Sequence, residues 1–154
     1  IFTRWFELQA GVTLQQSRYK EPEQWSEDAD VPPVRRMFRT PDLYGYITCN
    51  YAFARRWNAT LSGTYSGSML VQHLTGSGTD TDVAETTPDF FDLNFKLTRE
   101  FRIMHSASID VSLGINNIFN SYQRRFDQGY LRDSGYIFGP MLPRSLSASV
   151  RFHI

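Results

Sequence analysis

The feature that most constrains this chain is an alternation of apolar and polar residues with a period of two. From residue 145 to residue 154 every second side chain is apolar, and those between are polar. This alternation is typical of a β-strand with one apolar and one polar face. In a soluble sandwich the apolar face would pack on a core. In a membrane barrel it would contact lipid, and the polar face would line a wet lumen.

The same pattern predicts about six antiparallel strands, and hence an all-β fold. The predicted strands cover residues 1–19, 43–53, 57–69, 91–98, 107–116 and 145–154. Their connections alternate between long and short. The long loops cover residues 20–42, 70–89 and 120–144, and the short links lie near residues 54–56 and 101–105. Short turns on one side and long loops on the other are the plan of an outer-membrane barrel, with the long loops extracellular and the short turns periplasmic.

Composition excludes several other classes of protein. The chain has 16 Lys+Arg against 16 Asp+Glu, so no basic surface suggests a nucleic-acid partner. Its single cysteine, Cys49, excludes an internal disulfide framework and a CxxC metal site. No segment approaches the ~20 apolar residues of a membrane helix. The mean hydropathy of -0.39 is that of a soluble protein, but hydropathy overlooks barrels, in which only alternate residues are apolar.

Charged residues on the polar faces of the strands favour a wet interior over a dry core. These candidate lumen-facing residues are Glu7, Asp92, Lys96 and Asp110. A soluble core would have to pair each of them, whereas a water-filled lumen would not. Aromatic residues at both strand ends fit the two interfaces of a membrane, although β propensity alone also favours aromatic residues.

Six strands are too few to close a membrane barrel. The smallest such barrels have about eight strands and the large transporters about 22. Open edges are not tolerated in lipid, because each unpaired backbone group costs several kcal/mol. The chain also opens at Ile1 inside an alternating segment. We therefore expect residues 1–154 to be the C-terminal segment of a larger barrel, with the remaining strands and a plug domain in a longer parent chain.

Several motifs in the chain resemble those of one known family. Gly114-Ile115-Asn116-Asn117-Ile118-Phe119-Asn120, followed by Tyr122, resembles the penultimate strand of TonB-dependent outer-membrane receptors. Gly139-Pro140, Pro143-Arg144 and the alternating final strand are similar to their last strand. Ser66-Gly67-Ser68-Met69 and the segment from Thr87 to Asn94 also resemble this family. The family commonly ends in Phe, whereas this chain ends in Ile154 with Phe152 two places before. These two residues are the candidate barrel-assembly signal.

The resemblance implies active import of a scarce, large nutrient across the outer membrane of a Gram-negative cell. Cargoes in this family include siderophore-iron, haem and cobalamin, and in some branches glycans or peptides. The implied partners are outer-membrane lipid and lipopolysaccharide, the rest of the barrel with its plug, TonB acting through the missing N-terminal region, and the barrel-assembly machinery. A surface lipoprotein is a further candidate partner. No cofactor is expected, and this segment would supply barrel wall and extracellular loops.

Two groups of loop residues are candidate ligand contacts. Arg35, Arg36 and Arg39 form a basic cluster that suits anionic chelates or phosphates, although a solvated loop or lipopolysaccharide would also explain it. His73 is a conceivable haem or metal contact. No second ligand stands at metal-site spacing from it, which favours an ordinary loop residue and predicts no metal site.

Three rival functions remain open at this stage. A passive porin or adhesin barrel would need no plug. A soluble ligand-binding β-barrel such as a lipocalin would be extracted without detergent. An outer-membrane phospholipase or protease would need a nucleophile paired with a histidine at the rim, and no serine lies in a nucleophile-elbow pattern. The chain is therefore predicted not to be an enzyme.

Overall fold

The structure, a computed structural model, describes residues 5–104 and 107–154. The start of the predicted first strand, at residues 1–4, and His105 in the second short link lie outside the described residues. Within them there is no α-helix, and so no helix able to span a membrane. All regular structure is antiparallel sheet, apart from one isolated parallel bridge between Phe38 and Leu70. The predicted all-β fold is confirmed.

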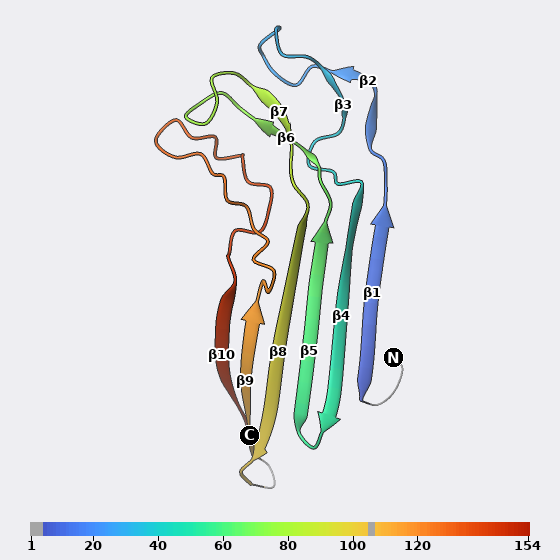
Figure 1. The fold of residues 1–154 in the computed structure, drawn as a ribbon, viewed down its shortest axis with the longest axis vertical. Coiled ribbons are helices and arrows are strands. Elements are labelled where there is room, and N and C mark those ends of the chain that lie inside the picture. The colour runs from blue at the N-terminus through green and yellow to red at the C-terminus, as the bar shows by residue number, and fades with distance from the viewer. Residues whose placement is uncertain (1–4, 105–106) are drawn as a thin grey trace.

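Six long strands form one sheet in which neighbours in the chain are neighbours in space (Figure 1). Their bounds are β1 Phe6–Leu14, β4 Leu43–Ala54, β5 Trp57–Ser66, β8 Phe90–Arg102, β9 Ser108–Asn116 and β10 Ser145–His153. The order β1-β4-β5-β8-β9-β10 is a simple meander, so β1 and β10 are its two edges. The sheet is open among the described residues, and no closed barrel is formed by them.

Two of the predicted long loops contain short hairpins. β2 Arg18–Glu23 pairs with β3 Val34–Arg36, and β6 Leu70–His73 pairs with β7 Val83–Thr86. The expectation that residues 20–42 and 70–89 are irregular is therefore only partly right. Residues 120–144 contain no strand. We call the connections 15–42, 67–89 and 117–144 together the loop cap.

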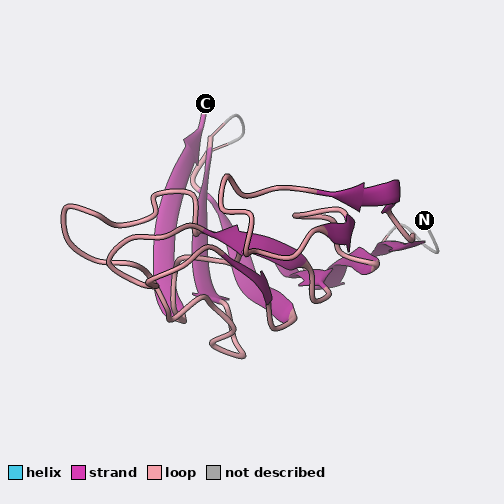
Figure 2. Ribbon diagram, turned by 90° about the horizontal axis from the view of Figure 1, so that it is seen from above, coloured by secondary structure: helices cyan, strands magenta, loops and turns pink. Residues whose placement is uncertain are grey.

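The loop cap lies at one end of the sheet and the short turns at the other (Figure 1). Seen from above in Figure 2, the cap segments lie over the strand ends. At the opposite end β4 and β5 are joined by Arg55 and Arg56 alone, and Arg56 adopts a left-handed φ of 68°. The predicted alternation of long and short connections is thus confirmed.

The strands pair in a register that brings all their apolar sets onto one face. A single row across the sheet contains Leu8, Cys49, Leu61, Phe95, Ile115 and Leu146. The next row contains Phe6, Tyr51, Ala59, Leu97, Leu113 and Ala148. A slip of one residue in any pair would move a whole strand's apolar set to the other face. The alternation seen in each strand therefore becomes a continuous apolar surface, which we call the apolar face.

Within the described residues nothing packs on the apolar face. The buried hydrophobic residues of the described chain are Val31, Val71, Phe90 and Tyr136. Three of them lie in the loop cap, and Phe90 is the first residue of β8, directly after the cap. By contrast Leu113 is 62% exposed and Val150 is 58% exposed, and all nine residues of β10 are exposed. The core of this chain thus lies in the loop cap, and the sheet itself carries no second layer.

Candidate functional site

The third connection is folded around one buried amide. Gln123 is 1% exposed, and its Nε2 donates to the carbonyls of Arg125 and Tyr136 at 2.6 and 3.0 Å. Its Oε1 accepts from the backbone nitrogens of Phe138 and Gly139 at 2.8 and 3.2 Å. A buried amide with its donors and acceptor satisfied holds a loop without regular structure in one conformation.

A buried histidine joins the second and third connections. His73, at the end of β6, is 8% exposed, and its Nε2 donates to the Asp127 carboxylate at 3.0 and 3.1 Å. Its Nδ1 lies 3.8 Å from Oε2 of Glu85 on β7. The ring stacks on that of Tyr136, with 3.7 Å between centroids. We call His73, Glu85, Asp127 and Tyr136 the histidine cluster.

Further hydrogen bonds connect the members of the histidine cluster to one another and to the backbone. The hydroxyl of Tyr136 donates to Oε2 of Glu85 at 2.5 Å. Burial, followed by this bond to a carboxylate, raises the pKa of the Tyr136 phenol above its ordinary value. Asp127 also accepts from the backbone nitrogen of Asp133 at 3.1 Å. The tyrosine thus stays neutral at physiological pH, and the cluster acts as a cross-link between loops.

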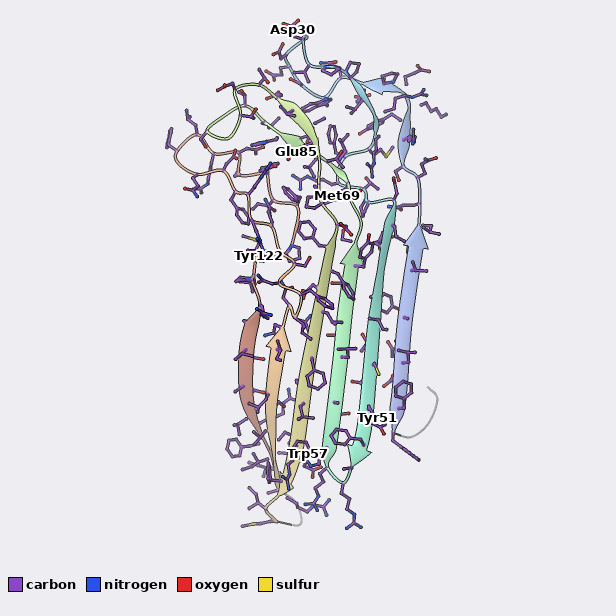
Figure 3. The ribbon with its side chains drawn as sticks, viewed as in Figure 1. Asp30, Tyr51, Trp57, Met69, Glu85 and Tyr122 are labelled. Carbon is purple, nitrogen blue, oxygen red and sulfur yellow. The ribbon has the colours of Figure 1, made fainter. Side chains whose placement is uncertain are left out.

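A cavity of about 390 Å³ lies beside the histidine cluster and shares Glu85 with it. Its lining residues are Glu85, Pro88, Phe90, Tyr122, Gln123, Arg124, Arg125 and Phe138. Glu85 and Tyr122 are labelled in Figure 3, between the sheet and the cap tips. Arg124 lies over the Tyr122 ring, 5.4 Å from its centroid, and Arg125 lies 3.6 Å from Glu85. Aromatic walls with arginines suit a ligand that combines a flat apolar body with negative charge.

The three arginines of the predicted basic cluster do not converge on one point. Arg35 donates to the Lys20 carbonyl at 2.6 Å. Arg36 donates to the Ser68 carbonyl at 2.9 Å and pairs with Asp42 at 3.1 Å. Arg39 donates to the carbonyls of Ile137, at 2.8 Å, and Gly135. Each guanidinium therefore holds cap segments together, and a role for the three in ligand contact stays a prediction.

The charged residues predicted to face a lumen do share one face, opposite the apolar face. Glu7 and Lys96 fall in one row of the sheet, through Asn50 and Thr60. Asp92 pairs with Thr64, and Asp110 with Glu100. Oδ1 of Asp92 is buried and has no hydrogen-bond partner among the described residues. His153 donates to Asp110 at 2.9 Å. We call this surface the polar face.

The motif around Asn117 forms a clip between β9 and the approach to β10. Asn117 is 4% exposed and adopts a left-handed φ of 49°. Its Nδ2 donates to the carbonyls of Ser121 and Leu142 at 3.2 and 2.9 Å, and its Oδ1 accepts from the nitrogen of Ser121 at 2.8 Å. Asparagine tolerates this backbone conformation better than most residues. The predicted terminal residues Phe152 and Ile154 are exposed, and their assembly role remains a prediction.

Sequence reasoning missed most of the site. It singled out His73 but not Glu85, Asp127 or Tyr136, which are 12 to 63 positions away in the chain, and it did not place Arg124 or Arg125 beside an aromatic cavity. Tyr136 follows Gly135 and opens a short apolar run with Ile137 and Phe138, which was a weak signal of a buried ring. Within residues 5–104 and 107–154, no group of three or more His, Cys, Asp or Glu side chains is arranged so that it could hold a metal ion.

Comparisons of this chain with protein-family models, with curated proteins and with solved structures found no match.

Proposed function

We propose that this chain forms part of the wall and the extracellular loops of a TonB-dependent transporter in a bacterial outer membrane. The observation that carries the proposal is the apolar face. It runs in register across all six strands, and no part of the described chain covers it. An uncovered apolar surface of this extent requires either lipid or further protein. Lipid agrees with the charged residues on the opposite face, which would meet water.

Strand length and edges support the same proposal. The six strands have 9 to 13 residues each, and crossing a bilayer takes about 9–11 tilted residues. Among the described residues, no strand pairs with the outer edge of β10 or with that of β1 from Glu7 to Leu14, and in lipid these edges would have to be matched by further strands. We therefore propose that the parent protein contributes the rest of a closed barrel. The short turns would face the periplasm and the loop cap the exterior.

The cavity in the loop cap is the proposed site of first contact with the cargo. Its aromatic walls and its two arginines suit a bulky anionic chelate better than a small neutral solute. The passive porin remains the second candidate, favoured by the same apolar face, since a porin wall has this pattern too.

The test is cargo uptake by cells that make the full-length protein. We expect the protein in the detergent-extracted outer-membrane fraction and uptake of a ferric chelate that stops when the proton gradient is dissipated. Uptake of small solutes that persists without the gradient would favour the porin. Recovery of the protein in the soluble fraction without detergent would refute both.

A further inference from the structure

Four arginines gather at the short-turn end of the sheet, far from the loop cap. Arg55, Arg56, Arg99 and Arg102 line a cavity of about 330 Å³ together with Glu100 and Phe101. In a chain whose acidic and basic residues are equal in number, this is a strong local excess of positive charge. Within residues 5–104 and 107–154, none of these four arginines forms an ion pair with a carboxylate. The cavity is therefore suited to an anion from outside the described chain.

Arg99 is held in place by aromatic rings. It lies on the apolar face, in register with Trp57 on β5 and Val111 on β9. Its guanidinium stands over the Trp57 ring at 5.0 Å and over the Phe101 ring at 4.7 Å. Stacking on two rings leaves the planar edge of the guanidinium free to donate hydrogen bonds. Such a donor is already oriented before a ligand arrives.

The rings around Arg99 continue a row along the short-turn end. Phe6 contacts Tyr51, Tyr51 stacks on Phe53, and Phe53 stacks on Trp57, with centroids 6.3, 5.8 and 6.1 Å apart. Tyr51 and Trp57 are labelled near the lower strand ends in Figure 3. Aromatic rings concentrate at the level of lipid headgroups. If the apolar face meets lipid, Arg99 stands at the depth of the phosphates.

The adjoining turn is tied to β8, which brings its two arginines to the same end of the sheet as Arg99. The carbonyl of Arg56 accepts a hydrogen bond from the nitrogen of Glu100 at 2.9 Å, which ties the β4–β5 turn to β8. Arg56 adopts a left-handed φ of 68°, which closes the turn directly before Trp57. Two elements therefore present guanidinium groups to one cavity.

We propose that this cavity binds the phosphate of an anionic phospholipid, with the acyl chains lying on the apolar face next to Val111 and Leu97. This inference rests on the proposed membrane location. A lipid suits the site better than a free anion, because two of the lining residues, Arg99 and Phe101, belong to the apolar face, where acyl chains would lie. The occupant would belong to the leaflet nearest the short turns.

The experiment compares lipids retained by the full-length protein. The protein is reconstituted into vesicles of phosphatidylcholine with or without phosphatidylglycerol, extracted gently, and examined by native mass spectrometry. We expect retained phosphatidylglycerol in the wild type. Each of Arg56→Gln and Arg99→Gln should reduce its retention roughly fivefold, since one arginine near an anionic surface contributes about 1 kcal/mol. Arg99→Lys should reduce it less, because the charge remains.

Matched controls separate this inference from the proposed function. Arg124→Gln and Arg125→Gln remove the same charge at the loop cap and should leave retention unchanged. A protein that inserts into both vesicles without preferring phosphatidylglycerol would overturn the lipid site alone. Displacement of the lipid by millimolar inorganic phosphate would show a site for soluble anions and would also overturn it. Failure of the wild type to insert into either vesicle would refute the membrane proposal itself, and the lipid site with it. Protease resistance of each variant checks its folding.

Discussion

Removing the carboxylate of Asp127 should open the loop cap without unfolding the sheet. The Asp127 side chain is 5% exposed and accepts from His73 and from the backbone nitrogen of Asp133. A hydrogen bond to a charged group contributes about 1.5–3 kcal/mol, and a buried donor left unpaired costs about 1–3 kcal/mol. Asp127→Ala loses both interactions, so we expect the cap to be destabilised by about 3–5 kcal/mol.

Hydrogen exchange is the appropriate assay, because the expected opening is local. The nitrogen of Leu74 donates to Asp133 at 2.9 Å, and that of Ser77 to the Leu131 carbonyl at 3.0 Å. Both amides report on the contact between the second and third connections. A loss of 3–5 kcal/mol corresponds to an increase in exchange of roughly 10²–10⁴-fold at these amides if cap opening limits their exchange. Amides in the middle of β4 and β5 should keep their protection.

A second variant tests the same contact without deleting either partner. A Cβ on Gly78 would lie 2.0 Å from Oδ1 of Asp127 and 2.7 Å from Nε2 of His73. Gly78→Ala should therefore separate the pair and increase exchange at the same amides. Asp80→Ala, in the same loop and exposed, is the control. The reasoning is refuted if Asp127→Ala and Gly78→Ala raise exchange no more than Asp80→Ala does.

Three further predictions concern the sheet, the clip and the pH dependence of the cap. Leu61→Arg should destabilise the protein in lipid by about 2–4 kcal/mol if its row lies at mid-bilayer, whereas Ser62→Arg on the polar face should not. Equal losses of stability in a refolding titration would contradict the assignment of Leu61 to the lipid-facing side. Asn117→Ala removes three side-chain hydrogen bonds and should destabilise the contact between β9 and β10 by about 3–4 kcal/mol, measured as faster hydrogen exchange in these two strands. Unchanged exchange would exclude a stabilising role of the clip. Asp82 accepts from Ser26 at 2.6 Å and from the nitrogen of Thr75, which lowers its pKa in the folded state. The contribution of Asp82 to cap stability is therefore present above about pH 4 and is lost as the pH falls through the lowered pKa. Ser26→Ala should weaken this loss of cap stability in acid. Identical acid profiles of the variant and the wild type in exchange experiments would refute the role of Asp82.

The sheet could be predicted from sequence because period-two alternation is a local signal. Each of the six strands contains enough alternating residues to show its two faces. The requirement that every apolar set share one face then excludes any slip by an odd number of residues. Boundaries were less accurate. The first strand was expected to reach Tyr19, but β1 ends at Leu14, where Gln15 bonds to the carbonyls of Pro41 and Asp42. Those bonds depend on a segment 26 residues away and leave no trace in the local pattern.

The candidate site could not be predicted in the same way. β6 and β7 have four residues each, too few for alternation to be distinguished from chance. His73 meets Asp127 only because the second and third connections fold against one another, 54 positions apart in the chain. Sequence spacing also suggested that Arg35, Arg36 and Arg39 form one basic patch. In the structure, backbone carbonyls of different segments draw the three guanidinium groups apart.

The strand order of the main sheet has a consequence for how the protein folds. Every strand pairs with the strand that directly precedes or follows it in the meander, so each pairing closes only one connection. The sheet can therefore form one hairpin at a time. The β4–β5 and β8–β9 hairpins would form early across their short turns, and the cap hairpins would dock afterwards. The slowest step would be joining β9 and β10, because the 28-residue stretch between them, unlike the equally long one between β1 and β4, contains no hairpin. The Asn117 clip would shorten that search if it forms early, because Asn117 at the start of the stretch donates a hydrogen bond to Leu142 near its end.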